Sequence, residues 1–551
     1  LRYNINRETE SHFSNLPTLS TKRSSFKRPS THKTSFNASD LIPIYVDSDI
    51  LPGDSVKMRM AEIIRMQTPI FPVMDNAYMD IYFFFVPHRI VWDHWKEFWG
   101  ENNLTAWEQQ VAYEIPQIEA PANTGWTEGT IADYMGIPTG VENISVNHLP
   151  FRSYVKCWND WFRDENLKDP AFMQTDETTL TGANSGNYVT AAQLGAAPLK
   201  VAKYHDYFTS ALPAPQKGPS VNLPIGKAAP IIGTDNIATG FTLDTNFVGK
   251  ELFSQRVGSG TTSITGVDSG QQLATSGSIG LAADLSNAIG ATINQLRQAF
   301  AVQAFYEAQS RGGSRYIEFI KNIFGVTSPD GRLQRAEYLG GTRVQINMDQ
   351  VLQTSSTDAV SPQGNTAAFS CTVNSEEDLF THSFTEHGTL IGVACIRTDH
   401  TYQQGINRMW SRKKWTDFYV PQLANLGEVP ILNKELYAQG TSVVDSDGNV
   451  VDEQVFGYQE AWADYRYMPS RVSGEMRSSF AQSLDAWHYA DDYNTLPTLS
   501  SGWIDETEDN IDRTISVQHS TANQFFGDFY FDPIYVRPMP VYSIPAMLNH
   551  F

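Results

Sequence analysis

Alternation of apolar and charged residues marks the first predicted strand. Val56, Met58 and Met60 alternate with Lys57 and Arg59, which is typical of a strand with one face on a core and one in water. Short apolar runs on either side are separated by turn signals such as "LPGD", in which Pro fixes φ and Gly accepts positive φ. Short strands separated by turns predict a β-sandwich or barrel.

A second stretch, "MDIYFFFVPHR" at residues 79–89, carries large rings on both faces of a predicted strand. Alternation assigns Tyr82 and Phe84 to one face and Phe83 and Phe85 to the other. Exposed rows of Phe side chains promote aggregation, so both faces of this strand need a cover. We expect one face to pack into the core of the sandwich.

Apolar residues at helical spacing predict helices in the connections between strands. Trp92, Trp95 and Trp99 recur at i, i+3 and i+7 before Gly100, a spacing that places them on one side of a helix. Similar stripes occur at residues 151–167, 291–313 and 315–325. We interpret all of these stripes as faces that pack in the core or at an interface, and not as catalytic or ligand-binding sites.

The last third of the chain returns to strand patterns. The run "THSFTEHGTLIGVACIRTDH" combines alternation with the apolar stretch of a central strand, and "RVQINM" and "AAFSCTV" precede it. The residues therefore predict a mainly β protein. Its core is a β-sandwich with long helix-containing loops and one large insertion.

The insertion has its own composition. In residues 257–280, 15 of 24 positions are Gly, Ser or Thr, and Lys and Arg are absent. The wider span 213–288 also contains strand-like pieces, which favour an ordered excursion over a flexible linker. Val257, Gly270 and Gly280 mark the candidate surface insertion.

Charge is unevenly distributed along the chain. The formal net charge is −21, yet residues 1–39 hold seven Lys and Arg against Glu8 and Glu10. This segment predicts a basic arm on an acidic body. The arm is either a solvated terminus or a tail that contacts nucleic acid or a neighbouring subunit.

Catalytic and metal-binding signatures are missing from the sequence. The metalloprotease HExxH, the Walker loop, the Rossmann fingerprint and the GxSxG elbow do not occur. Cys157, Cys371 and Cys395 form no metal spacing and no disulfide framework, which is typical of a reducing cytosol. No apolar run reaches the roughly 20 residues of a membrane span. We expect no catalytic residues, no metal and no cofactor.

An enzyme remains the alternative from composition alone. Glycosidases combine paired carboxylates with many Trp residues, and this chain has 12 Trp and acidic clusters at 376–378 and 491–492. The alternative is therefore a secreted or cytosolic carbohydrate-active β-sandwich enzyme.

Several long blocks resemble a known family. They include "TPIFPVMDNAYMDIYFFFVPHRIVW", "RGGSRYIEFIKNIFGVTSPDGRLQRAEYLGG" and "EAWADYRYMPSRVSGEMRS", and they run in family order from about residue 10 to residue 551. They resemble the major capsid protein of the Microviridae, small single-stranded DNA phages, and most of all its gokushovirus-like branch.

The resemblance implies an eight-stranded viral jelly roll of two Greek keys and the simplest icosahedral shell (T=1). It implies a place in the virion, assembly in the cytoplasm of a bacterial host, and an insertion that projects near the threefold axes for host attachment. The implied parts are an internal arm at 1–39, the first part of the jelly roll at 40–212, the insertion at 213–288 and the remainder at 289–551.

The same resemblance implies the partners. They are other copies of the chain, the single-stranded DNA genome, a small basic DNA-associated protein, pilot- or spike-type minor virion proteins and a host receptor. Helical excursions or a neighbouring subunit then cover the second aromatic face. The candidate DNA or inner-surface contacts are Arg23, Phe26, Lys27, Arg28 and Lys33. The candidate intersubunit or core aromatics are Tyr82, Phe83, Phe84, Phe85, Trp92, Trp95 and Trp99.

Overall fold

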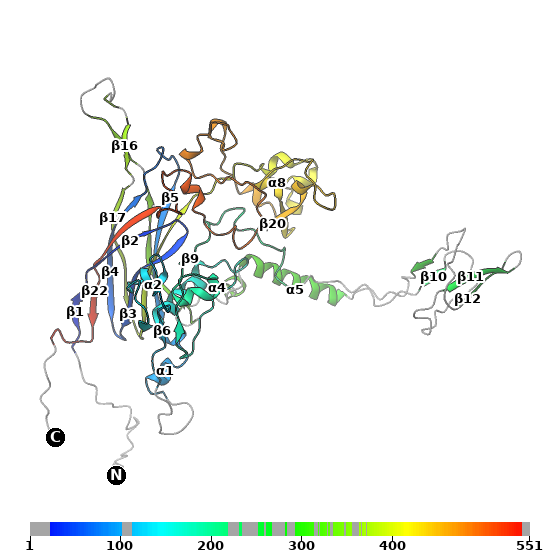
Figure 1. Ribbon diagram of the computed structural model, residues 1–551. Helices are drawn as coiled ribbons and strands as arrows, with labels where there is room; N and C mark the ends of the chain where they lie inside the picture. Colours follow the sequence, from blue (N-terminus) through cyan, green and yellow to red (C-terminus); the bar gives the residue numbers. More distant parts are fainter. Residues whose placement is uncertain are drawn as a thin grey trace, which may run out of the picture. The chain divides into compact units, whose positions relative to one another are not determined.

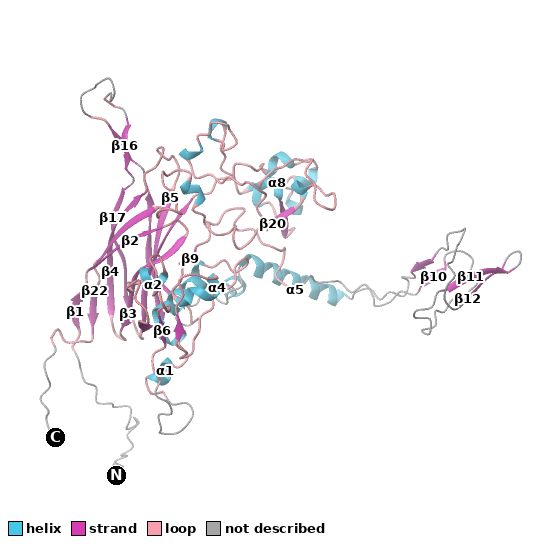
Figure 2. Cartoon of the chain, in the orientation of Figure 1, coloured by secondary structure: helices cyan, strands magenta, loops and turns pink. Residues whose placement is uncertain are grey.

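The computed structural model describes residues 22–101, 113–218, 231–233, 252–257, 261–266, 281–283, 293–312, 318, 320–327, 329–330, 334–346, 349–354, 363–364, 366–370 and 372–542. The chain divides into two compact units, the first of Leu1–Pro215 with Ser310–Phe551 and the second of Gln216–Gln309. The first unit is mainly β, with antiparallel sheets and short helices in the connections (Figures 1 and 2). No helix in the described residues is long and apolar enough to cross a bilayer.

The first sheet is built around one long central strand. In spatial order it contains β17 (Thr372–Ser383), β4 (Ser55–Met66), then β21 (Phe525–Phe531) with β22 (Ile534–Arg537), and last β2 (Ser30–Phe36) with β1 (Ser24–Lys27). β21 and β22 pair with successive stretches of β4, and β2 and β1 pair with β21 and β22 in turn. Each of these two pairs of strands therefore acts as one interrupted strand.

Two prolines account for the interruption. Pro29 separates β1 from β2, and Pro533 separates β21 from β22. Proline has no N–H to donate to a ladder, so it is confined to breaks, bulges and edges. The two breaks lie opposite each other, since the backbone N–H of Arg28 donates to the carbonyl of Pro533 at 3.2 Å.

The second sheet contains the strand with rings on both faces. Its order is β14 (Glu337–Ile346), β5 (Ala77–Pro87), β18 (Gly388–Thr398), β3 (Asp40–Ile50) and β9 (Leu199–Lys200). β18 is buried along almost its whole length between β5 and β3, as its sequence predicts. A Cβ at Gly392 would lie 2.8 Å from the ring of Phe83, so the close approach of β18 to β5 requires glycine there.

Alternation along β5 divides its rings between two cores. Phe83 and Phe85 lie between the sheets with residues of β4, β21 and β22, whereas Phe84 lies in a second core on the other face of the sheet. The ring of Phe84 lies 5.6 Å from Trp161 and 5.9 Å from Phe162. This chain itself therefore covers both faces, and no neighbouring subunit is needed for the second one.

Short helices and strands in the long connections form the cover over that second core. They are α1 (Trp95–Phe98), β6 (Gln117–Glu119), α2 (Ile131–Tyr134), β7 (Ser145–Asn147), α3 (Leu149–Cys157), the π-helical turn η2 (Trp158–Phe162), β8 (Leu180–Thr181) and α4 (Tyr188–Ala191). The stripe at 151–167 corresponds to α3 and η2. The predicted helix of Trp92, Trp95 and Trp99 is only four residues long. Trp92 is buried, while Trp99 is exposed beyond the end of α1.

A separate lobe follows β18. We call residues 399–480 the aromatic lobe; it contains β19 (Glu428–Leu432), α8 (Asn433–Leu436) and β20 (Val455–Glu460), and α9 (Asp509–Asp512) lies in the segment that returns to β21. Its core holds Tyr207, Phe208, Ile431 and Phe456. The rest of the unit includes β15 (Asp349–Leu352), paired with β16 (Thr366–Ser370), and the turn η5 (Ile320–Phe324), which ends at Gly325 with φ +67°.

The second unit covers most of the predicted insertion. β10 (Ile231–Gly233) pairs with β13 (Leu281–Ala283), and β11 (Leu252–Val257) pairs with β12 (Thr261–Gly266). The predicted long helix is α5 (Ile293–Gly312). Val257 is the last residue of β11, whereas Gly270 and Gly280 lie outside the described residues.

Candidate interaction surfaces

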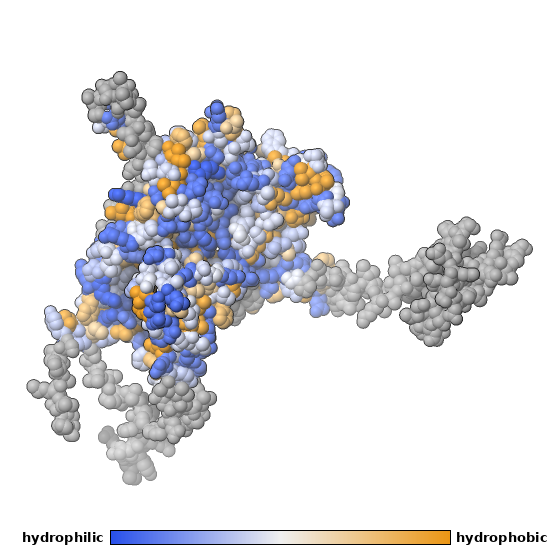
Figure 3. Space-filling view, viewed as in Figure 1, coloured by the Kyte–Doolittle hydropathy of each residue, from blue (hydrophilic) through white to orange (hydrophobic). Residues whose placement is uncertain are grey.

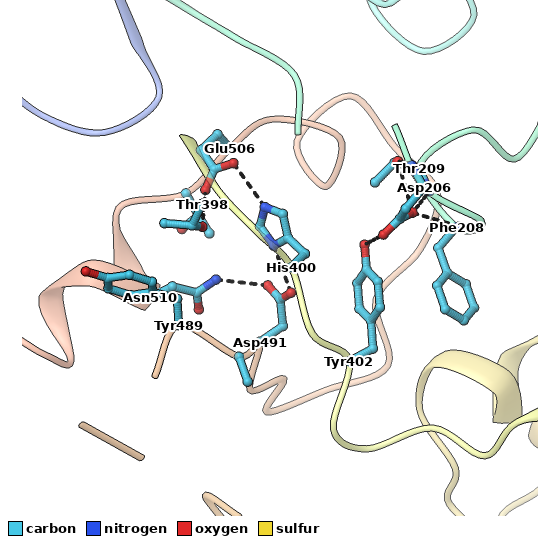
Figure 4. Close-up of polar contacts among 12 residues, drawn as sticks. Asp206, Phe208, Thr209, Thr398, His400, Tyr402, Tyr489, Asp491, Glu506 and Asn510 are labelled. Carbon is cyan, nitrogen blue, oxygen red and sulfur yellow. Dashed lines mark hydrogen bonds and ion pairs between the residues drawn. The ribbon is translucent and has the colours of Figure 1, made fainter. Parts of the chain in front are cut away.

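A buried cluster of charges invites comparison with a catalytic site (Figure 4). His400 Nδ1 lies 2.8 Å from Asp491 Oδ2, and Nε2 lies 3.0 Å from Glu506 Oε2. The hydroxyl of Thr398 donates to Glu506 at 2.9 Å, and the amide of Asn510 donates to Asp491 at 3.1 Å. The cluster thus joins the end of β18 to the segments around residues 491, 506 and α9.

Electrostatics keep this cluster charged. Burial alone would lower the pKa of His400, but the two carboxylates outweigh it and raise that pKa to about 10. Burial alone would raise the pKa of Asp491, but His400 and its other partners lower it to about 2. The side chains of His400, Asp491 and Glu506 are each at most 3% exposed. The cluster has no access for a substrate, and its chemistry is that of a structural ion pair.

No metal centre stands out in the described part of the chain, where no group of three His, Cys, Asp or Glu side chains is arranged to hold an ion. The two histidines that follow β5, His88 and His94, have different contact partners. His88 is buried against Ser48 and Thr389, and burial lowers its pKa to about 4. His94 contacts Glu177 instead.

The outward face of the first sheet is basic and aromatic. We call it the basic sheet face, and its described side chains are Lys27, Lys33, Lys57, Arg59, Ile63, Arg65, Asp378, Phe526, Asp528 and Tyr530. Phe526 and Tyr530 are exposed on β21. Five cations stand against two carboxylates in this set, although the chain as a whole is acidic.

The predicted contact residues of the basic arm fall into two groups, those held in contacts within the subunit and those exposed on this face. Arg23 donates to the carbonyls of Gly53 and Val536, and Arg28 pairs with Asp47 at 2.6 Å, so both are structural contacts. Phe26 packs toward the core. Lys27 and Lys33 are exposed, and Lys33 lies 3.9 Å from Asp528.

Sequence reasoning missed the other basic and aromatic members of this face. Alternation predicts Arg59 only as part of the wet face of a strand, and Arg65 carries no signal of its own. Their register across β4 and β21 brings them together: Arg65 lies opposite Phe526, and Ala61 lies opposite Tyr530. Alternation along "FFGDFYF" was the available signal for Phe526 and Tyr530.

The predicted aromatics of β5 have a polar end as well. The hydroxyl of Tyr82 lies 3.1 Å from Arg397, and burial raises the pKa of Tyr82 to about 12. Arg397 and Arg343 both contact the buried carboxylate of Asp80. A cavity of about 320 Å³ lies beside Tyr82 and Trp161. Because Asp80 already pairs with both arginines, neither of them offers an unpaired positive charge to a ligand in this cavity.

A second surface lies on the aromatic lobe (Figure 3). Cavities of about 340 and 390 Å³ share Arg408, Glu435 and Asp464 in their walls, so the residues around them form one continuous surface. We call this surface the lobe face; its exposed members are Trp410, Lys413, Lys414, Trp415, Phe418, Leu426, Tyr465, Met468 and Arg471. The sequence signal is "RMWSRKKWTDFY", where aromatics interleave with cations without helical or strand periodicity.

Known proteins are similar to this chain over nearly its whole length. A model of the family described as capsid protein (F protein) matches residues 14–547. The chain is 42% identical over 556 residues to the capsid protein VP1 of Bdellovibrio phage phiMH2K, covering 99% of both chains. It is 43% identical over 536 residues to the capsid protein VP1 of Spiroplasma virus 4, covering 94% of both. It is 37% identical over 588 residues to that of Chlamydia phage 1, covering 97% of both.

Proposed function

This chain belongs to the phage capsid protein (F protein) family, and we propose that its copies close into a small icosahedral shell around a circular single-stranded DNA genome. The chain is a structural protein of the virion and not an enzyme, which sets the glycosidase alternative aside. The proposal concerns the shell, its contents and the parts of the chain that face each of them.

The strand order supports an eight-stranded viral jelly roll. Counting each interrupted pair as one strand, the chain order is β1 with β2, then β3, β4, β5, β14, β17, β18, and last β21 with β22. The first sheet then reads first, eighth, third, sixth, and the second reads second, seventh, fourth, fifth. This alternation between two four-stranded sheets is the pattern that two Greek keys produce.

The basic sheet face is the surface we assign to the DNA, and its composition is the observation that carries the proposal. Single-stranded DNA binds to surfaces that combine cations for its phosphates with aromatic rings for its bases. Lys33 and Arg65 supply exposed charge beside the exposed rings of Phe526 and Tyr530. In an acidic protein such a face is suited to the inside of a shell that holds nucleic acid.

Binding of purified subunits to an oligothymidylate tests this assignment. Each lost phosphate contact reduces the slope of log affinity against log salt by about 0.7 for a single strand. We expect that reduction for Lys33→Gln, and none for Lys96→Gln, which removes an exposed lysine on α1. Tyr530→Ala removes a stacking ring, so it should weaken binding by about 1–3 kcal/mol at an unchanged slope. Equal slopes for both lysine variants, with unchanged affinity for Tyr530→Ala, would contradict the assignment.

The second unit is the part we assign to the outside of the shell. It forms its own compact unit, and paired strands lie within residues 213–288, the predicted insertion. These features support a protrusion near the threefold axes that contacts a host receptor. Other virion partners proposed from the family resemblance are a small basic DNA-associated protein and pilot- or spike-type minor proteins.

A further inference from the structure

The lobe face carries large apolar side chains that a single subunit leaves exposed. Trp410 and Trp415 are 75% and 72% exposed, and exposed Met468 lines the same cavity as Trp410. Exposed apolar patches with polar rims mark sites of protein contact. In a protein that self-associates, a second copy is the partner to consider first, and this step rests on the proposed function.

The charge of the lobe face restricts what covers it. Arg412 is held inside the lobe by Asp464 and by the ring of Tyr465, 4.3 Å from its guanidinium carbon. Lys413, Lys414 and Arg471 are exposed, and their side chains form no ion pair with any described residue. Asp417 lies beside the two lysines, where its Oδ2 accepts from both of their backbone N–H groups, so three cations stand against one carboxylate here. The surface that covers the lobe face should therefore carry carboxylates without partners of their own.

One lobe of the same chain has that property. Residues 113–151 contain five Asp and Glu residues and no Lys or Arg, and they include β6, α2 and β7. We call this segment the acidic lobe. Glu114, Glu119, Glu128 and Glu142 are exposed, and within the described residues none of them forms an ion pair. Exposed Val141 beside Glu142 adds an apolar contact.

In another acidic stretch of the first unit, most acidic groups are already neutralised. Around residues 491–512, Asp505 pairs with Lys168 at 2.7 Å, Asp491 with His400, Glu508 with Lys200 and Asp512 with His519. These pairs leave that stretch few free carboxylates for a second subunit. The acidic lobe is thus a better complement than the stretch at 491–512.

We infer that the lobe face of one copy docks on the acidic lobe of a neighbouring copy. In Figure 1 the elements α8 and β20 lie well apart from β6 and α2 within the first unit, so one copy does not pair its own two surfaces. A contact between two different patches is heterologous, and such contacts close into rings when the rotation between neighbours allows it. Repeated around an axis, this contact joins the copies of a shell.

Charge reversal on each side, and on both sides together, tests the inference. The basic-side variant is Lys413→Glu with Lys414→Glu, and the acidic-side variant is Glu128→Lys with Glu142→Lys. Each should reduce the yield of particles at least about tenfold, because like charges then face each other. The chain with all four substitutions restores opposite charges at every contact, so its yield should return to within about threefold of the wild type.

Two controls keep the result specific. Lys96→Glu reverses an exposed charge on α1, outside both lobes, and should leave the yield of shells unchanged. Soluble subunits of every variant should melt within about 2 °C of the wild type, since exposed substitutions change stability little. Where a reversal does not give soluble subunits, Lys414→Gln and Glu142→Gln replace it with a smaller change on each side.

The inference is overturned if the fourfold variant remains unassembled, if only one side matters, or if neither reversal reduces the yield. Failure of the proposed function looks different. In that case the wild-type chain forms no shell, whereas failure of this inference leaves wild-type shells intact and removes only the rescue.

Discussion

His400 is the residue whose charge the fold has to keep. It is nearly fully buried between Asp491 and Glu506, where an uncompensated charge is strongly destabilising. The folded pKa of His400, about 10, exceeds its ordinary value of 6.5, so its contribution to stability is complete below pH 6.5 and is lost as pH rises through 10. Asp491, with a pKa of about 2, contributes above pH 3.8 and loses that contribution as pH falls through 2.

We therefore predict a pH slope that depends on His400. Between pH 7 and 9 the folded subunit holds one more proton than the unfolded chain at this site. The free energy of unfolding should fall by about 1.4 kcal/mol per pH unit more in the wild type than in His400→Gln. Urea denaturation of soluble subunits measures it, and His205→Gln, at an exposed histidine, is the control.

A direct measurement covers the case in which His400→Gln does not fold. Nuclear magnetic resonance of wild-type subunits with labelled histidine should show one imidazole that stays protonated from pH 5 to pH 9. Titration of every described histidine below pH 8 would contradict the charge assigned to His400.

Single residues differ in how far the sequence predicts them. The faces of Phe83 and Phe84 follow from alternation, because side-chain direction in a strand is a local property. The cover over Phe84 does not, since Trp161 and Phe162 are brought to it by the fold. The partners of His400 are 91 and 106 residues away. No local pattern specifies such a contact.

Elements with strong periodicity are the ones that the sequence predicts well. β4 and β18 follow their patterns of alternation and burial. The segment at 24–36, by contrast, is predicted only as part of a basic arm, and it forms two strands of the first sheet. Its Ser, Thr and Lys residues give little hydrophobic signal, because β1 and β2 lie at the edge of that sheet. Pairing with β21 and β22, about 500 residues later in the chain, determines their structure.

For the second unit, we predict the effect of removing the β11–β12 hairpin on assembly and on adsorption to host cells. Replacing residues 252–266 by a short Gly-Ser linker removes both strands of one hairpin and leaves β10 and β13 in place. We expect particles to form in normal yield, because the unit has its own contacts. Adsorption to host cells should fall by at least about a hundredfold, since attachment through many copies multiplies weak affinities.

A matched control shortens the turn between β15 and β16, in the first unit, by a similar replacement. That variant should adsorb normally. Normal adsorption of the β11–β12 variant would remove the receptor from this hairpin, and loss of particles would show that the hairpin belongs to the shell instead.

The complete subunit has a charge that does not match the DNA that we propose as the contents of the shell. Each chain has a formal net charge of −21, and single-stranded DNA adds one negative charge per nucleotide. The basic sheet face offers five cations against two carboxylates among its described side chains, far fewer than a genome requires. In the proposed particle other cations therefore have to accompany the DNA, and a small basic polypeptide is the partner that the family resemblance implies.

We predict that DNA-filled particles contain cationic material that empty shells of the same chain do not. Density centrifugation separates the two, acid extraction with mass spectrometry measures basic polypeptides, and elemental and amine analyses measure metal ions and polyamines. If a basic polypeptide supplies the charge, exchange into buffer free of polyamines and divalent ions should leave the filled particles intact. If mobile ions supply it, the same exchange should release DNA, because nothing then screens its self-repulsion. Filled particles with no more of any of these cations than empty shells would contradict the charge argument.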